Sequence, residues 1–335
     1  MLLLLVLVAL AACQRGCDAR GDESQAYEPK RISELRGPYK VINAHEHLQS
    51  VEVAERLLRT MDEMSVAKTV ILAGSRRTTR GLQNEFVDYE ENNAAMLEAA
   101  RRWPERFVPF VTIDTDDPGK LAKLRRWIAR GAKGVKLYSG HGEFYTRPLD
   151  ATDMMEVYAY CEEHQVPILF HVNGGRYLDE FERVLQAHPD LQVICPHFCL
   201  LSNSPRTFRR VMDTYPRLLT DISFGIPAFM NDGLERVSDH VDRFRGLILA
   251  YPDRMLWGSD VVVTRHRRKS ETFMKRVYGA YFAMLGERSY SYTAYDADYH
   301  VKTDNPTERN GLYLPPNVLR QIYEANFLQV VTPRP

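Results

Sequence analysis

His45 and His47 are two residues apart at the end of an apolar run, in the segment Ile42–His47. Strand side chains alternate between two faces, so this spacing places both imidazoles on the same face. Two imidazoles so placed can bind one metal ion, although paired histidines also occur as hydrogen-bonded structural residues. The pair alone therefore leaves metal binding and a structural role equally open.

Three further residues that bind metals through nitrogen or oxygen follow other apolar runs. They are His171 after Val166–Phe170, His197 after Leu191–Cys195, and Asp260 after Arg254–Trp257. Each lies just past the carboxyl end of a predicted buried strand, which is where α/β barrels build their active sites. One such residue would be interpreted as a structural histidine or a loop-capping aspartate, but four independent strand ends together favour a metal site.

The elements that must position these residues form a regular pattern. Short runs rich in Val and Ile alternate with stretches of helical period, which is typical of βα units and a parallel sheet. The predicted strands are Val41–His45, Lys68–Leu72, Phe107–Ile113, Gly134–Tyr138, Val166–Phe170, Leu191–Cys195, Leu218–Asp221 and Arg254–Trp257. Eight strands with interleaved helices predict an α/β fold, a TIM-type (β/α)8 barrel forming a single domain over residues 38–332. A doubly wound open sheet would normally carry a glycine-rich phosphate turn after its first strand, where this chain has His-Glu-His.

The ordered set of segments resembles the amidohydrolase superfamily, in the amidohydrolase-related branch that also contains aromatic-acid decarboxylases. The matching segments are Ile42–His47, Trp103–Phe107, Gly131–Leu137, Pro167–His171, Pro196–His197, Gly258–Asp260 and Ile322–Asn326. The resemblance implies that one divalent ion is held by His45, His47, His171 and Asp260. Such a donor set suits Zn²⁺, with Mn²⁺ or Fe²⁺ as alternatives.

The same resemblance implies the reaction. Asp260 would take a proton from a water activated by the metal, and His197 would stabilise the developing oxyanion or shuttle the proton. The predicted function is hydrolysis of an amide, lactone or ester carbonyl of a small molecule. Two alternatives remain: non-oxidative decarboxylation of a small aromatic or unsaturated acid, and a catalytically inactive binding lipoprotein of the envelope.

Other residues are candidates for substrate contact. Arg76 could hold a substrate carboxylate, although a solvated basic loop is the alternative. His141 follows the fourth strand in a glycine-containing loop. Lys136 ends that strand, where related binuclear enzymes carry a carboxylated lysine, but one metal is favoured here. Asn43 departs from the family, which usually has Asp before the histidine pair.

The overall charge narrows the partners. Lys plus Arg and Asp plus Glu number 44 each in 335 residues, so the chain has no long-range field of one sign. This balance disfavours nucleic acid and favours a small-molecule substrate, with homo-oligomer formation left open.

The N-terminus predicts export. Residues 1–12 form an apolar run too short to span a bilayer, which needs about 20 apolar residues, and Leu10–Cys13 resembles a bacterial lipobox. Residues 1–12 are therefore predicted to be a signal peptide, although no positive residue precedes the run, and an ordinary cleaved or buried signal is the alternative. Lipidated Cys13 would anchor the chain to the cell envelope, on the periplasmic side of the outer membrane, through a flexible tether over 13–37.

Two features lie outside this pattern. Cys195 and Cys199 have a spacing that could suit a metal, but buried structural thiols are favoured, because the odd cysteine count fits no disulfide framework. The tyrosine-rich segment 287–314 interrupts the alternation of strands and helices. It is predicted to be an inserted loop near the mouth of the barrel, or else an excursion packed on the outside.

Overall fold

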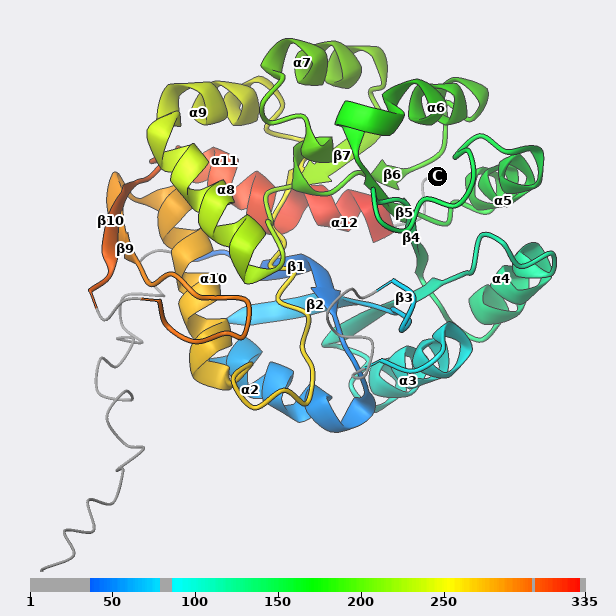
Figure 1. Cartoon of the computed structure of the whole chain (residues 1–335), viewed down its shortest axis with the longest axis horizontal. Coiled ribbons are helices and arrows are strands. Elements are labelled where there is room, and N and C mark those ends of the chain that lie inside the picture. The colour runs from blue at the N-terminus through cyan, green and yellow to red at the C-terminus, as the bar shows by residue number, and fades with distance from the viewer. Residues whose placement is uncertain (1–36, 79–85, 303–304, 332–335) are drawn as a thin grey trace, which may run out of the picture.

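The computed structural model describes residues 37–78, 86–302 and 305–331. Its main sheet has eight strands in chain order, each parallel to the next, which confirms the predicted (β/α)8 barrel (Figure 1). The strands are β1 (Val41–His47), β2 (Val66–Leu72), β3 (Phe107–Thr112), β4 (Gly134–Gly140), β5 (Ile168–Val172), β6 (Val193–Ile194), β7 (Leu218–Asp221) and β8 (Met255–Leu256).

Helices surround the strands, as their apolar faces require. They are α2 (Ala54–Glu63), α3 (Tyr89–Arg102), α4 (Lys120–Ala129), α5 (Thr152–Glu163), α6 (Gly174–Ala187), α7 (Pro205–Thr214), α8 (Pro227–Asp239), α9 (Val241–Ala250), α10 (Glu271–Gly286), α11 (Pro316–Arg320) and α12 (Asn326–Val331), with short turns η1 (Val51–Val53), η2 (His197–Leu200) and the π-helical η3 (Gln321–Ala325). In α2, Leu57 and Met61 are buried while Glu55 is exposed, so one face packs on the sheet and the other meets solvent.

Backbone hydrogen bonds close the barrel between its first and last strands. The amide of Ala44 donates to the carbonyl of Trp257 at 2.8 Å, and the amide of Asp260 donates to the carbonyl of His45 at 2.8 Å. The carboxyl end of β1 and the segment that follows β8 are thereby held side by side. This closure brings His45 and Asp260 together although they are 215 positions apart.

The barrel interior is a separate apolar cluster that includes Ile42, Phe110 and Leu169. Phe327 and Val330 of α12 belong to the same cluster. The amide side chain of Asn326 donates to the carbonyls of Pro252 and Met255, at the amino end of β8. The last helix therefore fills the end of the barrel opposite to the carboxyl ends of the strands. Figure 1 shows it lying across the middle of the ring of outer helices.

The tyrosine-rich segment contains an antiparallel pair of strands, β9 (Ser289–Tyr292) and β10 (Thr307–Asn310). The pair lies beside α8, where the Asn310 amide donates to Ser238 Oγ at 2.8 Å. Between the strands, Ala297, Asp298 and Tyr299 border the cavity at the carboxyl ends of the barrel strands. The segment thus packs on the outside and also reaches the mouth.

The expectation of free thiols at Cys195 and Cys199 is wrong, because the structure joins them in a disulfide. His197, Phe198, Cys199 and Leu200 all have positive φ angles, between 52° and 58°. This left-handed turn folds the chain back after β6 and brings the two Cα atoms to 5.1 Å. Spacing in the sequence could not reveal such a turn, since none of the four residues is glycine.

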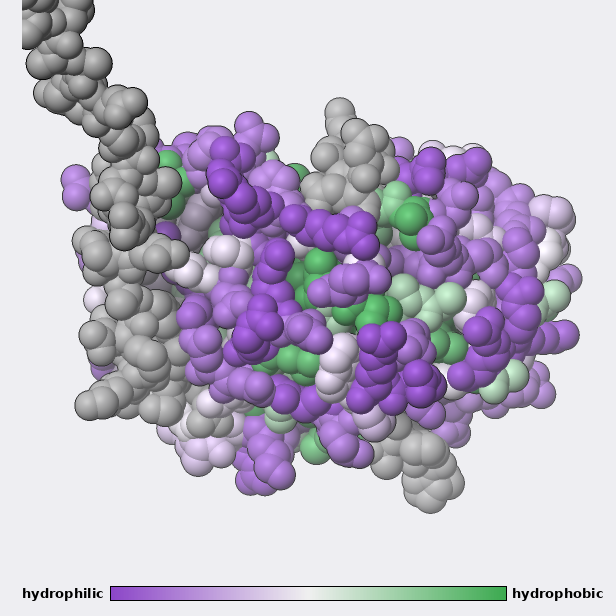
Figure 2. Space-filling model, turned by 90° about the horizontal axis from the view of Figure 1, so that it is seen from below, coloured by the Kyte–Doolittle hydropathy of each residue, from purple (hydrophilic) through white to green (hydrophobic). Residues whose placement is uncertain are grey.

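The predicted signal peptide and nearly all of the predicted tether, residues 1–36, lie outside the described residues. In the part of the chain that the structure describes, no helix is both long enough and apolar enough to cross a bilayer. The side of the molecule shown in Figure 2 is mainly hydrophilic, with hydrophobic residues in smaller areas among the hydrophilic ones.

Candidate metal centre and active site

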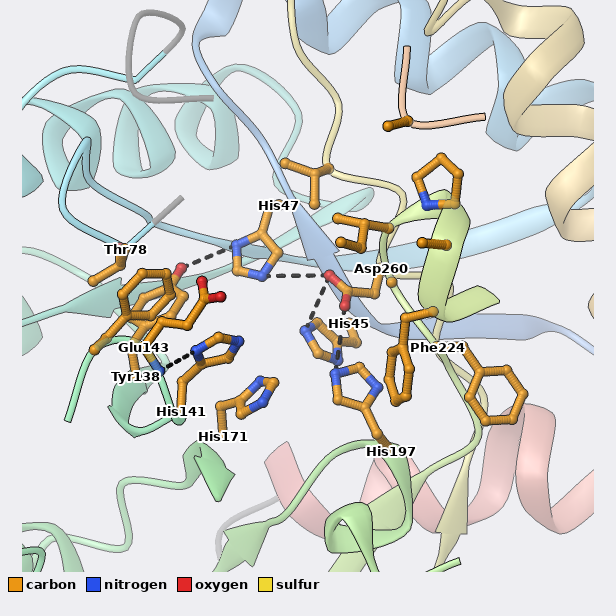
Figure 3. Close-up of a pocket in the computed structure, with 18 of the residues that line it drawn as sticks. His45, His47, Thr78, Tyr138, His141, Glu143, His171, His197, Phe224 and Asp260 are labelled. Carbon is orange, nitrogen blue, oxygen red and sulfur yellow. Dashed lines mark hydrogen bonds and ion pairs between the residues drawn. The ribbon is translucent and has the colours of Figure 1, made fainter. Parts of the chain in front are cut away.

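The candidate metal ligands and His197 meet in one cavity of about 650 Å³ at the carboxyl ends of the strands (Figure 3). Its lining includes His45 and His47 from β1, Lys136 from β4, His171 from β5, His197 from η2 and Asp260 from the segment after β8. Parallel strands all present their carboxyl ends at this rim, so residues from five places in the chain converge.

The Asp260 carboxylate is the centre of the group. Its Oδ1 lies 3.4 Å from His45 Nε2 and 3.5 Å from His47 Nε2, and its Oδ2 lies 3.5 Å from His197 Nε2. The ligand atoms of His45, His197 and Asp260 all lie within 4.8 Å of one another, close enough to hold one metal ion. Figure 3 shows the three imidazoles directed at the carboxylate.

Hydrogen bonds on the far side of two rings define where their protons lie. His45 Nδ1 is 2.8 Å from Asp221 Oδ2, and His197 Nδ1 is 2.8 Å from the carbonyl of Ser223. A carboxylate and a carbonyl only accept, so both Nδ1 atoms carry the proton. Each Nε2 therefore presents a lone pair toward Asp260.

His47 is oriented in the same way by a tyrosine. Tyr138 donates its hydroxyl proton to the carbonyl of Ala73 at 2.7 Å, and its oxygen lies 3.1 Å from His47 Nδ1. Because that proton is already used, the Tyr138 oxygen accepts from His47 Nδ1. A third Nε2 lone pair is thereby directed at the Asp260 carboxylate.

Three lone pairs around a carboxylate suit a cation. His45 Nε2 is buried and has no hydrogen-bond partner, which is unfavourable unless something else binds it. Burial lowers the pKa of His45 to about 3 and the pKa of His47 well below its ordinary value, so both rings are neutral and able to bind metal. The donors present therefore fit a divalent ion of the zinc type.

Asp260 is held in an unusual backbone conformation. Its φ is +49°, in the left-handed region that non-glycine residues seldom adopt. Gly225, at φ +78°, makes room for it, since a Cβ there would stand 2.6 Å from Asp260 Oδ2. Burial raises the Asp260 pKa, while the nearby Lys136 cation opposes the shift. A bound cation would favour the ionised carboxylate further.

His171 and His197 are arranged differently from the sequence expectation. The His171 ring lies 5.2 Å from that of His197, and burial lowers its pKa well below the ordinary value. His171 borders the cavity but lies outside the group of three with mutually close ligand atoms. His197, predicted to act on the substrate or water, is in that group.

The predicted substrate contacts divide between two places. Lys136 and His141 both border the cavity. Burial lowers the pKa of Lys136 to about 8, with Asp260 and Asp221 opposing, and the His141 ring stacks on Phe144 at 4.5 Å.

Arg76 lies elsewhere. It borders a separate hollow that also includes Gln49 and Arg265, and its side chain is 58% exposed beside Asp88. The structure therefore does not bring Arg76 to the cavity.

A model of the amidohydrolase family matches residues 46–326, which include His47, His171, His197 and Asp260 but not His45. The chain belongs to the amidohydrolase family. No curated protein matches the sequence.

Three solved structures illustrate how the amidohydrolase resembles known barrels. An uncharacterised TIM-barrel protein from Bordetella bronchiseptica is 17% identical, with a TM-score of 0.55 over 90% of this chain and 89% of its own. 2,6-Dihydroxybenzoate decarboxylase from Rhizobium is 13% identical, with a TM-score of 0.56 over 88% and 98%. An amidohydrolase from Burkholderia multivorans with bound zinc is 13% identical, with a TM-score of 0.58 over 87% and 98%. At these identities the likeness establishes the fold.

Sequence reasoning missed residues of this amidohydrolase that orient the imidazoles. Asp221 accepts from His45 Nδ1, from the His197 amide at 3.2 Å and from Ser223 Oγ at 2.7 Å. Burial alone would raise the pKa of Asp221, but the adjacent His45 ring and the hydrogen bonds from His45 and Ser223 hold it below its ordinary value. Asp221 ends β7, so the rule that found the other strand-end residues could have found it too.

A buried polar network ties β1 to the segment carrying Asp260. Asn43 Nδ2 donates to Ser259 Oγ at 2.7 Å, and Asn43 Oδ1 accepts from the Ser259 amide at 3.1 Å. Ser259 Oγ in turn donates to Glu46 Oε2 at 2.6 Å, and the Val262 amide donates to Glu46 Oε1. Since an amide both donates and accepts, Asn43 satisfies both Ser259 groups.

Proposed function

We propose that this amidohydrolase uses one divalent cation, zinc with manganese or iron as alternatives, to hydrolyse an amide, lactone or ester of a small molecule. One observation carries the proposal: three neutral imidazoles direct Nε2 at the buried Asp260 carboxylate, at the base of a cavity of about 650 Å³. That volume suits a small-molecule substrate.

His45, His47 and Asp260 would hold the cation. His171 would be the fourth ligand, since it borders the same cavity with its ring 5.2 Å from that of His197, although it lies outside the group with mutually close ligand atoms. When bound there, the ion would polarise a substrate carbonyl and promote the ionisation of water. The zinc in the matched Burkholderia structure supports this choice of metal. The Nδ1 partners on His45 and His47 support it as well, because they fix the tautomer that can act as a ligand.

The chain's own residues would then move the protons. Asp260 accepts one from water as the oxygen of that water bonds to the carbonyl carbon. His197, protonated at Nδ1, has a free Nε2 lone pair 3.5 Å from Asp260 Oδ2, so it suits a shuttle that takes this same proton from Asp260 and delivers it to the leaving nitrogen or oxygen. Breakage of the carbon–nitrogen or carbon–oxygen bond then gives an acid and an amine or alcohol.

Decarboxylation is a second candidate, favoured by one observation. Lys136 is a buried cation in the same cavity and could hold a substrate carboxylate. The matched decarboxylase from Rhizobium has the same fold. Release of carbon dioxide from aromatic acids, without hydrolysis of any amide, lactone or ester, would favour this candidate over hydrolysis.

The test is turnover of a panel of small amides, lactones and esters before and after chelation. We expect chelation to abolish turnover and added Zn²⁺ to restore it. Asp260→Asn should lower kcat by roughly 10²- to 10⁴-fold while the protein stays folded. Asp239→Asn, which removes an exposed carboxylate of α8, is the matched control. Turnover unaffected by chelation and by Asp260→Asn would refute the proposal.

A further inference from the structure

One wall of the cavity is apolar. It is formed by Phe224 and Ile226 of the segment that joins β7 to α8, and by Pro227 and Phe229 in the first turn of α8. The Phe229 ring meets His197 edge-on at 5.7 Å and Phe224 edge-on at 5.8 Å. The wall therefore begins beside the group that would act on the substrate, and a bound molecule must contact it.

Ile226 extends this wall to the mouth of the cavity. It is 54% exposed, the most exposed large apolar side chain among the described residues. Its backbone is extended (φ −60°, ψ 155°), and Pro227 follows as the first residue of α8. A residue before proline is restricted to extended conformations, so the backbone that carries the Ile226 side chain is fixed at this point of the wall.

Fixed positive charge is confined to the opposite part of the cavity. Among the described lining residues, the one lysine or arginine side chain is Lys136. Its Nζ lies 4.9 Å from the Tyr138 ring centre, and Asp260 and Asp221 act on its charge. An anionic group of a substrate that lay against Phe224, Ile226 and Phe229 would lose part of its hydration. No lysine or arginine among the described lining residues of this wall would compensate for that loss.

We infer that the substrate carries an uncharged apolar group, a single ring or a short alkyl chain, on the side away from its reacting carbonyl. That group packs against Phe224, Ile226 and Phe229, while the carbonyl faces His197 and Asp260. This inference rests on the proposed function and names its substrate class.

Two esters that differ in one group test it. Methyl 4-methylbenzoate and monomethyl terephthalate share the same reacting ester and ring, but the second has a carboxylate where the first has a methyl group. We expect kcat/KM to be at least about tenfold higher for the neutral ester. Ile226→Arg adds a cation to the wall and should shift this ratio toward the anionic ester by about tenfold. Leu249→Arg, at an exposed leucine of α9 away from the cavity, should leave the ratio unchanged.

A binding measurement separates this inference from the proposed reaction. 4-Methylacetophenone and 4-acetylbenzoate are ketones of the same shapes and cannot be hydrolysed, so calorimetry reports binding alone. The inference is supported if the neutral ketone binds more tightly than the anionic ketone and if Ile226→Arg reduces this preference. If both results hold but no ester is turned over, the proposed hydrolysis fails and the inference stands. Equal binding, preference for the anion, or no binding of either ketone overturns the inference.

Discussion

At the scale of single residues, His45 shows that the cavity is arranged for a cation and that this arrangement lowers the stability of the metal-free protein. Asp221 fixes its proton on Nδ1, which leaves Nε2 buried with no hydrogen-bond partner. An unsatisfied buried group of this kind costs about 1–3 kcal/mol. Since a cation would bind this atom directly, metal binding should also raise the free energy of unfolding.

Gly225 offers a test of how closely Asp260 must fit. In Gly225→Ala, the new Cβ would stand 2.6 Å from Asp260 Oδ2, so the carboxylate must move. We expect metal affinity to fall by at least about tenfold. Gly131→Ala is the matched control, because Gly131 also has positive φ but a Cβ there meets nothing within 4 Å. Both variants carry a backbone cost of about 1 kcal/mol, and equal metal affinity in the two would contradict this account.

The roles of His171 and His197 can be separated by metal analysis. We expect His171→Ala to lower both metal affinity and activity by more than about 100-fold, because it removes a proposed ligand. His197→Ala should lower kcat by roughly 10²- to 10⁴-fold while metal remains bound, because it removes a proton shuttle. Elemental analysis of both purified variants checks this. If His197→Ala loses the metal and His171→Ala retains it, these assignments are wrong, and His197 is the ligand in place of His171.

The sequence could reveal site residues that lie at strand ends, but not residues whose role depends on a tertiary contact. Five of the candidate residues lie at strand ends, so topology alone brings them to one cavity. They are His45, His47, His171, His197 and Asp260. Arg76 follows a strand as well, but its side chain pairs with Asp88 outside the cavity. Tyr138 orients His47 through a hydroxyl, and nothing in a strand pattern distinguishes such a tyrosine from a core residue.

At the scale of secondary-structure elements, a polar cluster links α3 to α4. Tyr89 of α3 donates its hydroxyl to Asp117 at 2.8 Å, and Lys123 of α4 pairs with the same carboxylate. The hydrogen bond from Lys123, followed by that from Tyr89, lowers the pKa of Asp117 to about 2. The cluster holds two neighbouring helices at the rim of the barrel.

This pKa shift gives a pH-dependent stability. The folded-state pKa of Asp117 is below its ordinary value of 3.8, so the ionised carboxylate stabilises the fold above that pH. The contribution is lost as the pH falls through about 2. After allowance for solvent screening, Asp117→Asn should cost about 0.5–1 kcal/mol at pH 7. Urea unfolding between pH 7 and pH 3 should show the gap between wild type and variant narrowing at the acid end, whereas a constant gap would refute this.

The predicted strands agree with the structure in their order and place, and β7 has the predicted bounds, but some strands are shorter than predicted. All eight strands exist, but β6 and β8 have only two residues each. After β6 the chain enters the left-handed turn of η2 instead of continuing as a strand. That turn depends on tertiary contacts, such as the His197 amide donating to Asp221, which local sequence does not encode.

At the scale of the whole molecule, attachment to the envelope stays a prediction that can be tested directly. Cys13 ends a lipobox-like segment, so we propose that it carries the lipid and that residues 13–37 tether the barrel. Cys13→Ser should move the protein from the membrane fraction to the soluble fraction and abolish labelling by radioactive palmitate. Cys17→Ser, four residues further on, is the matched control. Unchanged fractionation and labelling of Cys13→Ser would exclude the anchor.

The position of α12 also bears on when the enzyme can first form during translation. Phe327 and Val330 complete the apolar filling of the barrel, and the Trp257 amide beside β8 donates to the carbonyl of Ile322. While these residues are still inside the ribosome exit tunnel, the end of the barrel opposite to the active-site rim stays unfilled. β8 then lacks its contacts with the last helix. His45 and Asp260 are joined across that same seam, so we expect the candidate metal centre to form only after α12 has left the exit tunnel and packed against the barrel.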